Sequence, residues 1–176
     1  MLGAARSGKS RWAEHLAAVS SLAVVYVATG AQRPQDSGWQ ERLNRHRQRR
    51  PASWRTLEVS QPEALSSALE GLRAHELALV DSLGSWVAAG LALEAESWDR
   101  LCDDLISTLC GSAAALVVVS EQTGWGVVPA TAIGGLFRDR LGALERRLVA
   151  RSAASWLVVA GRALNLMALG HSVPAD

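Results

Sequence analysis

The segment that most restricts the fold lies within the first ten residues and reads Gly3-Ala4-Ala5-Arg6-Ser7-Gly8-Lys9-Ser10. Its spacing, G-x-x-x-x-G-K-S, is that of the phosphate-binding P-loop. In such a loop the backbone N–H groups surround phosphate oxygens, and the helix that follows points its positive end at them. All eight positions are therefore expected to line a nucleotide site: Gly3, Ala4, Ala5, Arg6, Ser7, Gly8, Lys9 and Ser10. The alternative is a glycine-containing turn that merely begins a helix.

Lys9 is the single lysine among the 18 basic residues of the chain. An ammonium group is a compact point charge, whereas a guanidinium is a planar fork that is too large for a loop closed around one phosphate. We therefore expect Lys9 to be a catalytic residue that holds nucleotide phosphates, and Ser10 to be a ligand of Mg²⁺. The motif indicates that the chain binds a nucleoside triphosphate.

Continuous apolar runs alternate with helical patterns along the chain. Runs of this kind are typical of strands that are covered on both faces, and their alternation with helices predicts a parallel sheet. The expected strands are Leu22–Ala28, Leu77–Val80, Ala114–Val119 and Trp156–Ala160, and the expected helices are Ser10–Ala18, Pro62–Arg73, Trp86–Leu93, Trp98–Leu109 and Ala132–Val149. The fold class is thus α/β, a P-loop NTPase-like parallel sheet flanked by helices, in a single domain over residues 1–176, with a loose tail after Leu166.

The strand that should precede the P-loop is nearly missing, since only Met1 and Leu2 stand before Gly3. We expect a truncated first strand. It is either a stub or the end of a strand whose chain begins further upstream, and we favour the second reading.

Asp81 ends the apolar run that begins at Leu77. In P-loop proteins an acid at the end of a second strand holds Mg²⁺ opposite the P-loop hydroxyl. The alternative is that Asp81 caps the helix that begins near Ser82. With the P-loop present we favour the first role, so Asp81 and Ser10 form the predicted metal site.

An arginine-rich helix is predicted over Glu41–Arg49, because Pro51 stops it near Arg50. Residues three and four apart share a face, which places His46 among Arg42, Arg49 and Arg50. Three guanidinium charges are expected to lower the pKa of His46 and keep it neutral, although the helix C-terminus favours the charged form. A neutral imidazole beside anion-binding arginines suits a nucleophile that attacks phosphorus. The alternative is a solvated basic helix that touches an acidic partner or RNA, but the segment lacks aromatic residues for base stacking.

Composition excludes several other classes. The net charge of +1 and the 49% hydrophobic content argue against disorder and against bulk polyanion binding. The apolar runs are too short for a membrane span, no signal peptide precedes the P-loop, and Cys102 and Cys110 do not form a disulfide framework. We expect a cytoplasmic protein that binds no nucleic acid.

Seven segments occur together that resemble one family: Ala5–Arg11, Tyr26-Val27-Ala28-Thr29, Arg42-x3-His46-x3-Arg50-Pro51-x2-Trp54-x-Thr56-x-Glu58, Val80-Asp81-x-Leu83-x2-Trp86, Gly124-Trp125-Gly126-Val127-Val128-Pro129, Phe137-Arg138-Asp139-x2-Gly142 and Leu157–Gly161. The chain resembles the bifunctional adenosylcobinamide kinase / adenosylcobinamide-phosphate guanylyltransferase of cobalamin biosynthesis. The resemblance implies that ATP or GTP phosphorylates the aminopropanol arm of adenosylcobinamide. His46 then takes GMP from GTP as a guanylyl-histidine and passes it on to give adenosylcobinamide-GDP.

The resemblance also implies a set of site residues and an assembly. The nucleotide-binding residues beyond the P-loop are Arg42, Arg49, Arg50, Glu58 and Asp81, the cofactor is Mg²⁺, and the protein is a homo-oligomer, expected to be a trimer. Three departures stand out: Ala4 replaces a second glycine, Glu121-Gln122 replaces Asn-Glu, and Arg45 replaces the first of two adjacent histidines.

Two other functions remain open from the residues. One is a P-loop small-molecule kinase with a structural arginine-rich helix. The other is a nucleotide-dependent binding module whose basic helix docks an acidic or nucleic-acid partner.

Overall fold

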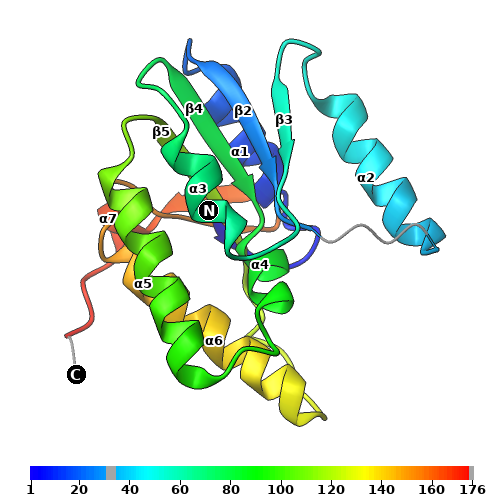
Figure 1. Cartoon of the computed structure of the whole chain (residues 1–176), viewed down its shortest axis with the longest axis vertical. Coiled ribbons are helices and arrows are strands. Elements are labelled where there is room, and N and C mark those ends of the chain that lie inside the picture. Colours follow the sequence, from blue (N-terminus) through cyan, green and yellow to red (C-terminus); the bar gives the residue numbers. More distant parts are fainter. Residues whose placement is uncertain (31–34, 175–176) are drawn as a thin grey trace.

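A sheet with strand order β3-β2-β4-β5-β1-β6-β7 runs through the described part of the chain (Figure 1). The computed structural model describes residues 1–30 and 35–174, apart from the side chains of Trp39, Arg42, Leu43, Arg45 and His46. Neighbouring strands are parallel except for the antiparallel pair β6–β7. The strands are β1 (Leu2–Gly3), β2 (Ala23–Ala28), β3 (Arg55–Glu58), β4 (Glu76–Asp81), β5 (Ala115–Glu121), β6 (Trp156–Val159) and β7 (Arg162–Asn165).

Helices cover both faces of this sheet, with α1 behind it and α3 and α5 in front in Figure 1. The helices are α1 (Lys9–Ala18), α2 (Ser37–Arg49), α3 (Ala64–Glu70), α4 (Leu83–Ala89), α5 (Ala95–Gly111), α6 (Ala132–Val149) and α7 (Leu166–Leu169). Among the described helices, none is both long and apolar enough to cross a membrane.

Alternate residues of β2 point into two separate cores. Val25 and Val27 pack with the core that includes α3, α4, α5 and α6, whereas Val24 and Tyr26 pack with Ala13 and Ala17 of α1. Both faces of the strand are therefore buried, which explains why its sequence is continuously apolar rather than alternating. The predicted parallel sheet flanked by helices is confirmed.

The first strand comprises Leu2 and Gly3 alone, which agrees with the expected truncated strand, yet it occupies an interior position between β5 and β6. The amide of Ser120 donates to the carbonyl of Met1 at 2.7 Å, and the amide of Gln122 donates to the carbonyl of Gly3 at 2.9 Å. These backbone bonds anchor the segment from which the P-loop begins.

The parallel strands bring their carboxyl ends to one edge of the sheet. The register pairs Ala28 with Asp81 and with Glu58, and Gly3 with Glu121. The ends of β1, β2, β3, β4 and β5 therefore lie together, where ligands bind in open α/β sheets.

Several boundaries and three short elements differ from the prediction. The edge strands β3 and β7 and the one-turn helix α7 were not predicted, and α7 occupies the start of the tail that was expected to be loose. The helix predicted over Trp86–Leu93 instead begins at Leu83 and ends before Gly90. A Cβ on Gly90 would lie 2.8 Å from the Trp98 ring, so the chain turns where that ring packs against it.

Candidate active site

The P-loop connects β1 to α1 with two residues in the left-handed region, Arg6 at φ 60° and Gly8 at φ 99°. Gly8 is the N-cap of α1 and has no side chain to cap it, while the first helical amide, that of Lys9, donates to Ser7 Oγ at 3.4 Å. The amide of Ser7 donates to the Ala4 carbonyl at 3.2 Å, which closes the loop. The first-turn N–H groups of α1 are therefore placed at an end where an anion is favoured.

Lys9 is buried, with 5% of its surface exposed, and its ammonium lies 3.5 Å from the carbonyl of Ala4. The ammonium thus folds back over the loop to which it belongs. This is the position from which a lysine reaches the phosphates that the loop encloses. Ser10 follows Lys9 in the first turn of α1.

Gly3 is required by close packing at the start of the loop. A Cβ there would lie 2.6 Å from both Ser7 Oγ and the carbonyl oxygen of Val158. Ala4 is exposed and does not have a positive φ. The structure therefore accommodates an alanine at position 4.

Asp81, at the end of β4, accepts a 2.9 Å hydrogen bond from the phenol of Tyr26 on β2. Burial, and then the charge of Asp81, raise the pKa of Tyr26 above its ordinary value, so the phenol remains a donor. The first-turn amide of α4, on Gly84, donates to Glu121 at 2.9 Å. Among the described residues, Glu121 therefore accepts the bond from the start of α4 that was considered for Asp81. The Asp81 carboxylate bonds instead to Tyr26.

Thr29 and Ser82 fix the backbone that follows Asp81. The Thr29 hydroxyl donates to the Ser82 carbonyl and accepts a bond from the Ser82 amide at 2.9 Å, and both residues are buried. The amide of Thr29 also donates to the Asp81 carbonyl at 3.4 Å. The ends of β2 and β4 are held together, which restricts where the Asp81 carboxylate can point.

The end of β5 is held by a partly buried carboxylate. Glu145 of α6 accepts hydrogen bonds from Ser120 Oγ at 2.6 Å and from Gln122 Nε2 at 3.0 Å. Burial raises the pKa of the Glu145 carboxyl, against the lowering effect of these two bonds. The backbone N–H of Gln122 donates to the carbonyl of Gly3, whereas its side chain bonds to Glu145. Gln122 therefore connects α6 to the P-loop.

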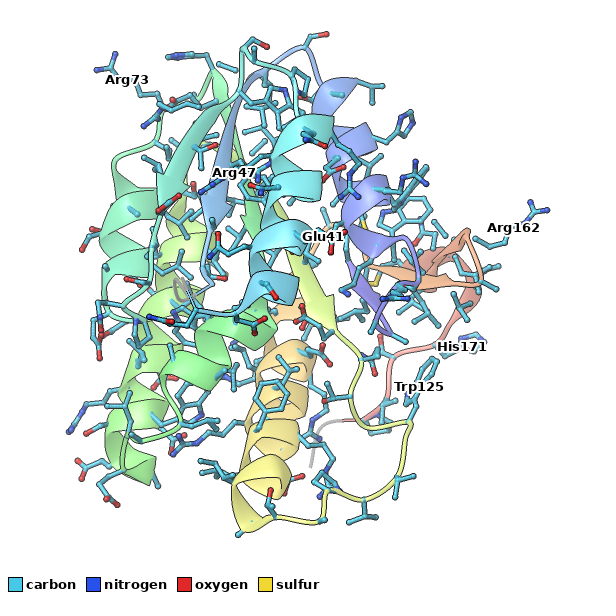
Figure 2. The ribbon with its side chains drawn as sticks, turned by 90° about the vertical axis from the view of Figure 1, so that its right-hand side faces the viewer. Glu41, Arg47, Arg73, Trp125, Arg162 and His171 are labelled. Atoms are coloured by element: carbon cyan, nitrogen blue, oxygen red, sulfur yellow. The ribbon has the colours of Figure 1, made fainter. Side chains whose placement is uncertain are left out.

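The arginine-rich helix α2 is docked onto this edge by its last residues. Arg47 forms a 2.9 Å ion pair with Glu58 of β3, and Figure 2 shows it on the side of α2 that faces the sheet. Arg49 pairs with Glu14 of α1 at 3.1 Å. The helix ends at Arg49, as the position of Pro51 predicts.

Arg50 connects the basic segment to the acid of the P-loop site. Its guanidinium carbon lies 3.6 Å from the centre of the Tyr26 ring, and the phenol of that ring bonds to Asp81. Arg49 and Arg50 therefore both reach the body of the protein. The predicted grouping of Arg42 with His46 lies outside the described side chains and stays a prediction.

The sequence motifs included Tyr26 and Thr29 without assigning them a role, and Glu14 and Glu145 were not recognised. Only the pairing of strands and helices brings these residues to the site. For Tyr26 a signal existed, since a tyrosine inside an otherwise aliphatic buried strand needs a partner for its hydroxyl.

The donors present fit Mg²⁺ bound together with a nucleotide. Magnesium is usually held by one or two carboxylates with phosphate oxygens and water, rather than by an all-protein cage. Within the described residues no group of three or more His, Cys, Asp or Glu could hold a metal. The carboxylate of Asp81 and the hydroxyl of Ser10 are the kinds of ligand that such a shared site uses.

Comparison with curated proteins finds relatives over most of the chain. A bifunctional adenosylcobalamin biosynthesis protein CobP of Pseudomonas aeruginosa is 38% identical over 172 residues, which is 92% of each chain. Two proteins named bifunctional adenosylcobalamin biosynthesis protein CobU are 34% identical (Salmonella typhimurium) and 32% identical (Escherichia coli), and each alignment covers 90% of this chain and 93% of the relative.

A solved structure of an ATPase from a type III secretion system matches with a TM-score of 0.55 at 10% identity. The match covers 97% of this chain and 57% of that one, so this chain spans little more than half of that ATPase. At such low identity the likeness concerns the fold alone, and it agrees with the P-loop architecture.

A family model described as "Cobinamide kinase / cobinamide phosphate guanyltransferase" matches residues 1–166. Together with relatives above 30% identity over nine-tenths of the chain, this match shows that the chain belongs to the cobinamide kinase / cobinamide phosphate guanylyltransferase family.

Proposed function

We propose that this chain catalyses both reactions of its family on adenosylcobinamide. ATP or GTP phosphorylates the hydroxyl of the aminopropanol arm, and GMP from GTP is then joined to that phosphate. The observation that carries the proposal is the contact series from Arg50 to Tyr26 to Asp81, which attaches the basic segment directly to the P-loop edge. These contacts support an arrangement in which the residues for both steps lie at one edge of the sheet.

In the kinase step the P-loop residues Gly3 to Ser10 bind the triphosphate through their backbone N–H groups, and Lys9 neutralises charge on the transferred phosphoryl group. Ser10 and Asp81 would hold Mg²⁺, which would neutralise negative charge on the triphosphate. Tyr26 orients the Asp81 carboxylate through its hydrogen bond. The arm hydroxyl attacks the terminal phosphorus, the bond from that phosphorus to the bridging oxygen breaks, the nucleoside diphosphate leaves, and the hydroxyl proton passes to water.

In the guanylyl step an imidazole nitrogen of His46 attacks the α-phosphorus of GTP. A P–N bond forms, the bond from the α-phosphorus to the bridging oxygen breaks, and pyrophosphate leaves. A phosphate oxygen of adenosylcobinamide phosphate then attacks the same phosphorus, and the P–N bond breaks to restore His46. Arg42, Arg49 and Arg50 bind the triphosphate and offset charge in the transition state.

Glu58 is proposed to contact the same nucleotide. It ends β3 at the carboxyl edge, in register with Ala28, and its carboxylate accepts a bond from Arg47. The pairing of Arg47 with Glu58 and of Arg49 with Glu14 also fits the simpler alternative, in which the arginines of α2 serve to dock the helix. The two readings differ in whether His46 becomes covalently modified.

The assembly and location belong to the same proposal. We place the chain in the cytoplasm as a single domain over residues 1–176 that forms a homo-oligomer, a trimer. Light scattering on the purified protein measures the assembly directly. A mass of three chains agrees with the proposal, and a stable monomer at working concentration contradicts this part of it.

Product analysis tests the two reactions. Adenosylcobinamide is incubated with the protein, Mg²⁺ and ATP, then with GTP, and the corrinoids are analysed by mass spectrometry. The proposal requires a product heavier by one phosphate with ATP, and the GDP-linked product after GTP is added. Lys9→Ala should abolish the first product. An unmodified corrinoid with well-folded wild-type protein would rule the proposal out.

A further inference from the structure

The segment after β5 carries no charge over residues 122–137, although 20% of the whole chain is charged. Its side chains are also unusually exposed for apolar residues. The exposed fractions are 67% for Trp125, 95% for Val127, 74% for Val128, 60% for Ile133 and 40% for Leu136. We refer to these five residues as the apolar patch. Several exposed apolar side chains within one short segment mark a binding site more often than ordinary surface does.

The apolar patch combines a loop with the first turn of a helix. Ile133 and Leu136 are three residues apart in α6 and share one of its faces. Figure 2 shows Trp125 directed away from the ribbon into open space. Gly124 and Gly126 flank this indole, so the loop around it can adapt its backbone to what it meets.

This patch begins next to the phosphate site. The amide of Gln122 donates to the carbonyl of Gly3, the first residue of the P-loop, at 2.9 Å. Trp125 follows three residues later, and three residues of chain span at most about 11 Å. A ligand seated on Trp125 is therefore within reach of a nucleotide in the P-loop.

We propose that the apolar patch binds the corrin macrocycle of the cobinamide substrate, an inference that rests on the proposed function. The macrocycle is a broad, flat ring system with neutral amide side chains. An indole offers it a stacking face, and the aliphatic residues offer it apolar contact. With the ring on Trp125, the aminopropanol arm extends toward the P-loop.

The distribution of charge supports this occupant. Arg47 and Arg49 of α2 and the adjoining Arg50 contact Glu58, Glu14 and Tyr26, which makes that side of the site basic. Residues 122–137, in contrast, present no ionised group that a macrocycle bearing amides would have to desolvate. A basic side and a neutral apolar side around one P-loop match the two substrates of one reaction.

The test measures binding without turnover. Equilibrium dialysis of cobinamide, followed by its visible absorbance, is carried out on the full chain with Mg²⁺ and a non-hydrolysable ATP analogue. The variants are Trp125→Ala, Trp125→Phe and, as a matched control, Val19→Ala, which alters an apolar residue that is 62% exposed at the end of α1. Affinity for the ATP analogue and light-scattering mass are measured on the same samples.

We expect Trp125→Ala to weaken cobinamide binding about tenfold, while Trp125→Phe, which keeps a stacking face, stays within about threefold of wild type. The control Val19→Ala should bind cobinamide like the wild type. All variants should bind the ATP analogue with unchanged affinity. If the wild type binds cobinamide and Trp125→Ala binds it equally tightly, the placement of the macrocycle on the apolar patch is overturned, and the proposed function is not affected. A fall in the mass of the Trp125→Ala assembly would assign the patch to a contact between copies and also overturn it. A wild type that binds the ATP analogue but no cobinamide would overturn the proposed function and the placement together.

Discussion

The phenol of Tyr26 donates a 2.9 Å hydrogen bond to Oδ2 of Asp81 across the neighbouring strands β2 and β4. Arg50 covers a face of the Tyr26 ring, and its guanidinium carbon lies 3.6 Å from the ring centre. Burial and the Asp81 charge keep the phenol protonated by raising its pKa. Tyr26 therefore joins Asp81, the acid of the P-loop site, to Arg50 at the end of the arginine-rich segment.

Tyr26→Phe tests the role of this bond in orienting Asp81. The ring under Arg50 is kept, and only the donor to the carboxylate is lost. Partners that orient a metal ligand typically change metal affinity by about tenfold or more, so the Mg²⁺ concentration for half-maximal kinase activity should rise about tenfold. An unchanged Mg²⁺ requirement would show that Asp81 needs no help from Tyr26.

Gly3→Ala tests the close packing at the start of the P-loop. The added Cβ would meet Ser7 Oγ and the Val158 carbonyl at 2.6 Å, and overpacking of this kind costs about 1–3 kcal/mol. We expect a Tm lower by several degrees, on the order of 5 °C, and weaker ATP binding in calorimetry. Ala4→Gly, one residue on at an exposed position, is the control and should bind ATP like wild type. Equal behaviour of the two variants would contradict the packing argument.

Arg140 is a buried cation that supports the connection between α4 and α5. Its guanidinium donates to the carbonyls of Gly90 at 2.9 Å, Leu91 at 3.3 Å and Leu93 at 2.7 Å, and lies over the Trp98 ring. Arg140→Met keeps the length but removes every donor, and should cost about 3 kcal/mol, or about 10 °C in Tm.

The matched control is Arg100→Met, because Arg100 forms an exposed pair with Glu96 on the surface of α5. Exposed pairs of this kind contribute little, so its Tm should move by less than about 2 °C. If Arg100→Met lowers the Tm as much as Arg140→Met does, the effect is one of arginine content and not of the buried contacts.

Glu145 predicts a pH dependence of stability. Burial raises the pKa of its carboxyl in the folded protein above the ordinary 4.5. At a pH between the unfolded-state pKa of 4.5 and the higher folded-state pKa, the folded state binds more protons than the unfolded state. The contribution of Glu145 to the free energy of unfolding therefore falls as pH rises above about 4.5, and it levels off once pH exceeds the folded-state pKa. Subtracting the urea-unfolding free energies of Glu145→Gln from those of wild type across pH 4–8 isolates the effect. A difference that rises with pH in that window would contradict it.

The interior of the sheet could be predicted from the sequence because its strands are apolar on both faces. β2, β4, β5 and β6 each overlap one predicted apolar run, with bounds that differ by no more than two residues at either end. The edge strand β3 could not be recognised, since Arg-Thr-Leu-Glu is largely exposed and is a strand only because it pairs with β2. The same holds for β7, which pairs only with β6 in a hairpin.

The site was predictable where chemistry is local and not where it depends on pairing. The P-loop and Asp81 follow from spacing within one segment. The bonds of Tyr26 to Asp81 and of Glu145 to Gln122 join residues that are 55 and 23 positions apart, and only the strand order brings them together. The sequence allowed Asp81 to cap α4. In the structure the Gly84 amide in the first turn of α4 donates to Glu121.

Whether His46 carries GMP is the central claim, and GTP labelled at the α-phosphate tests it most directly. The protein is incubated with this GTP and Mg²⁺, denatured, and the bound label is measured. The account predicts a label that is labile in acid and stable in alkali, present in wild type and in the control His15→Ala, and absent from His46→Ala. A wild type that makes the GDP-linked product without any protein-bound label, or a label that persists in His46→Ala, would contradict it.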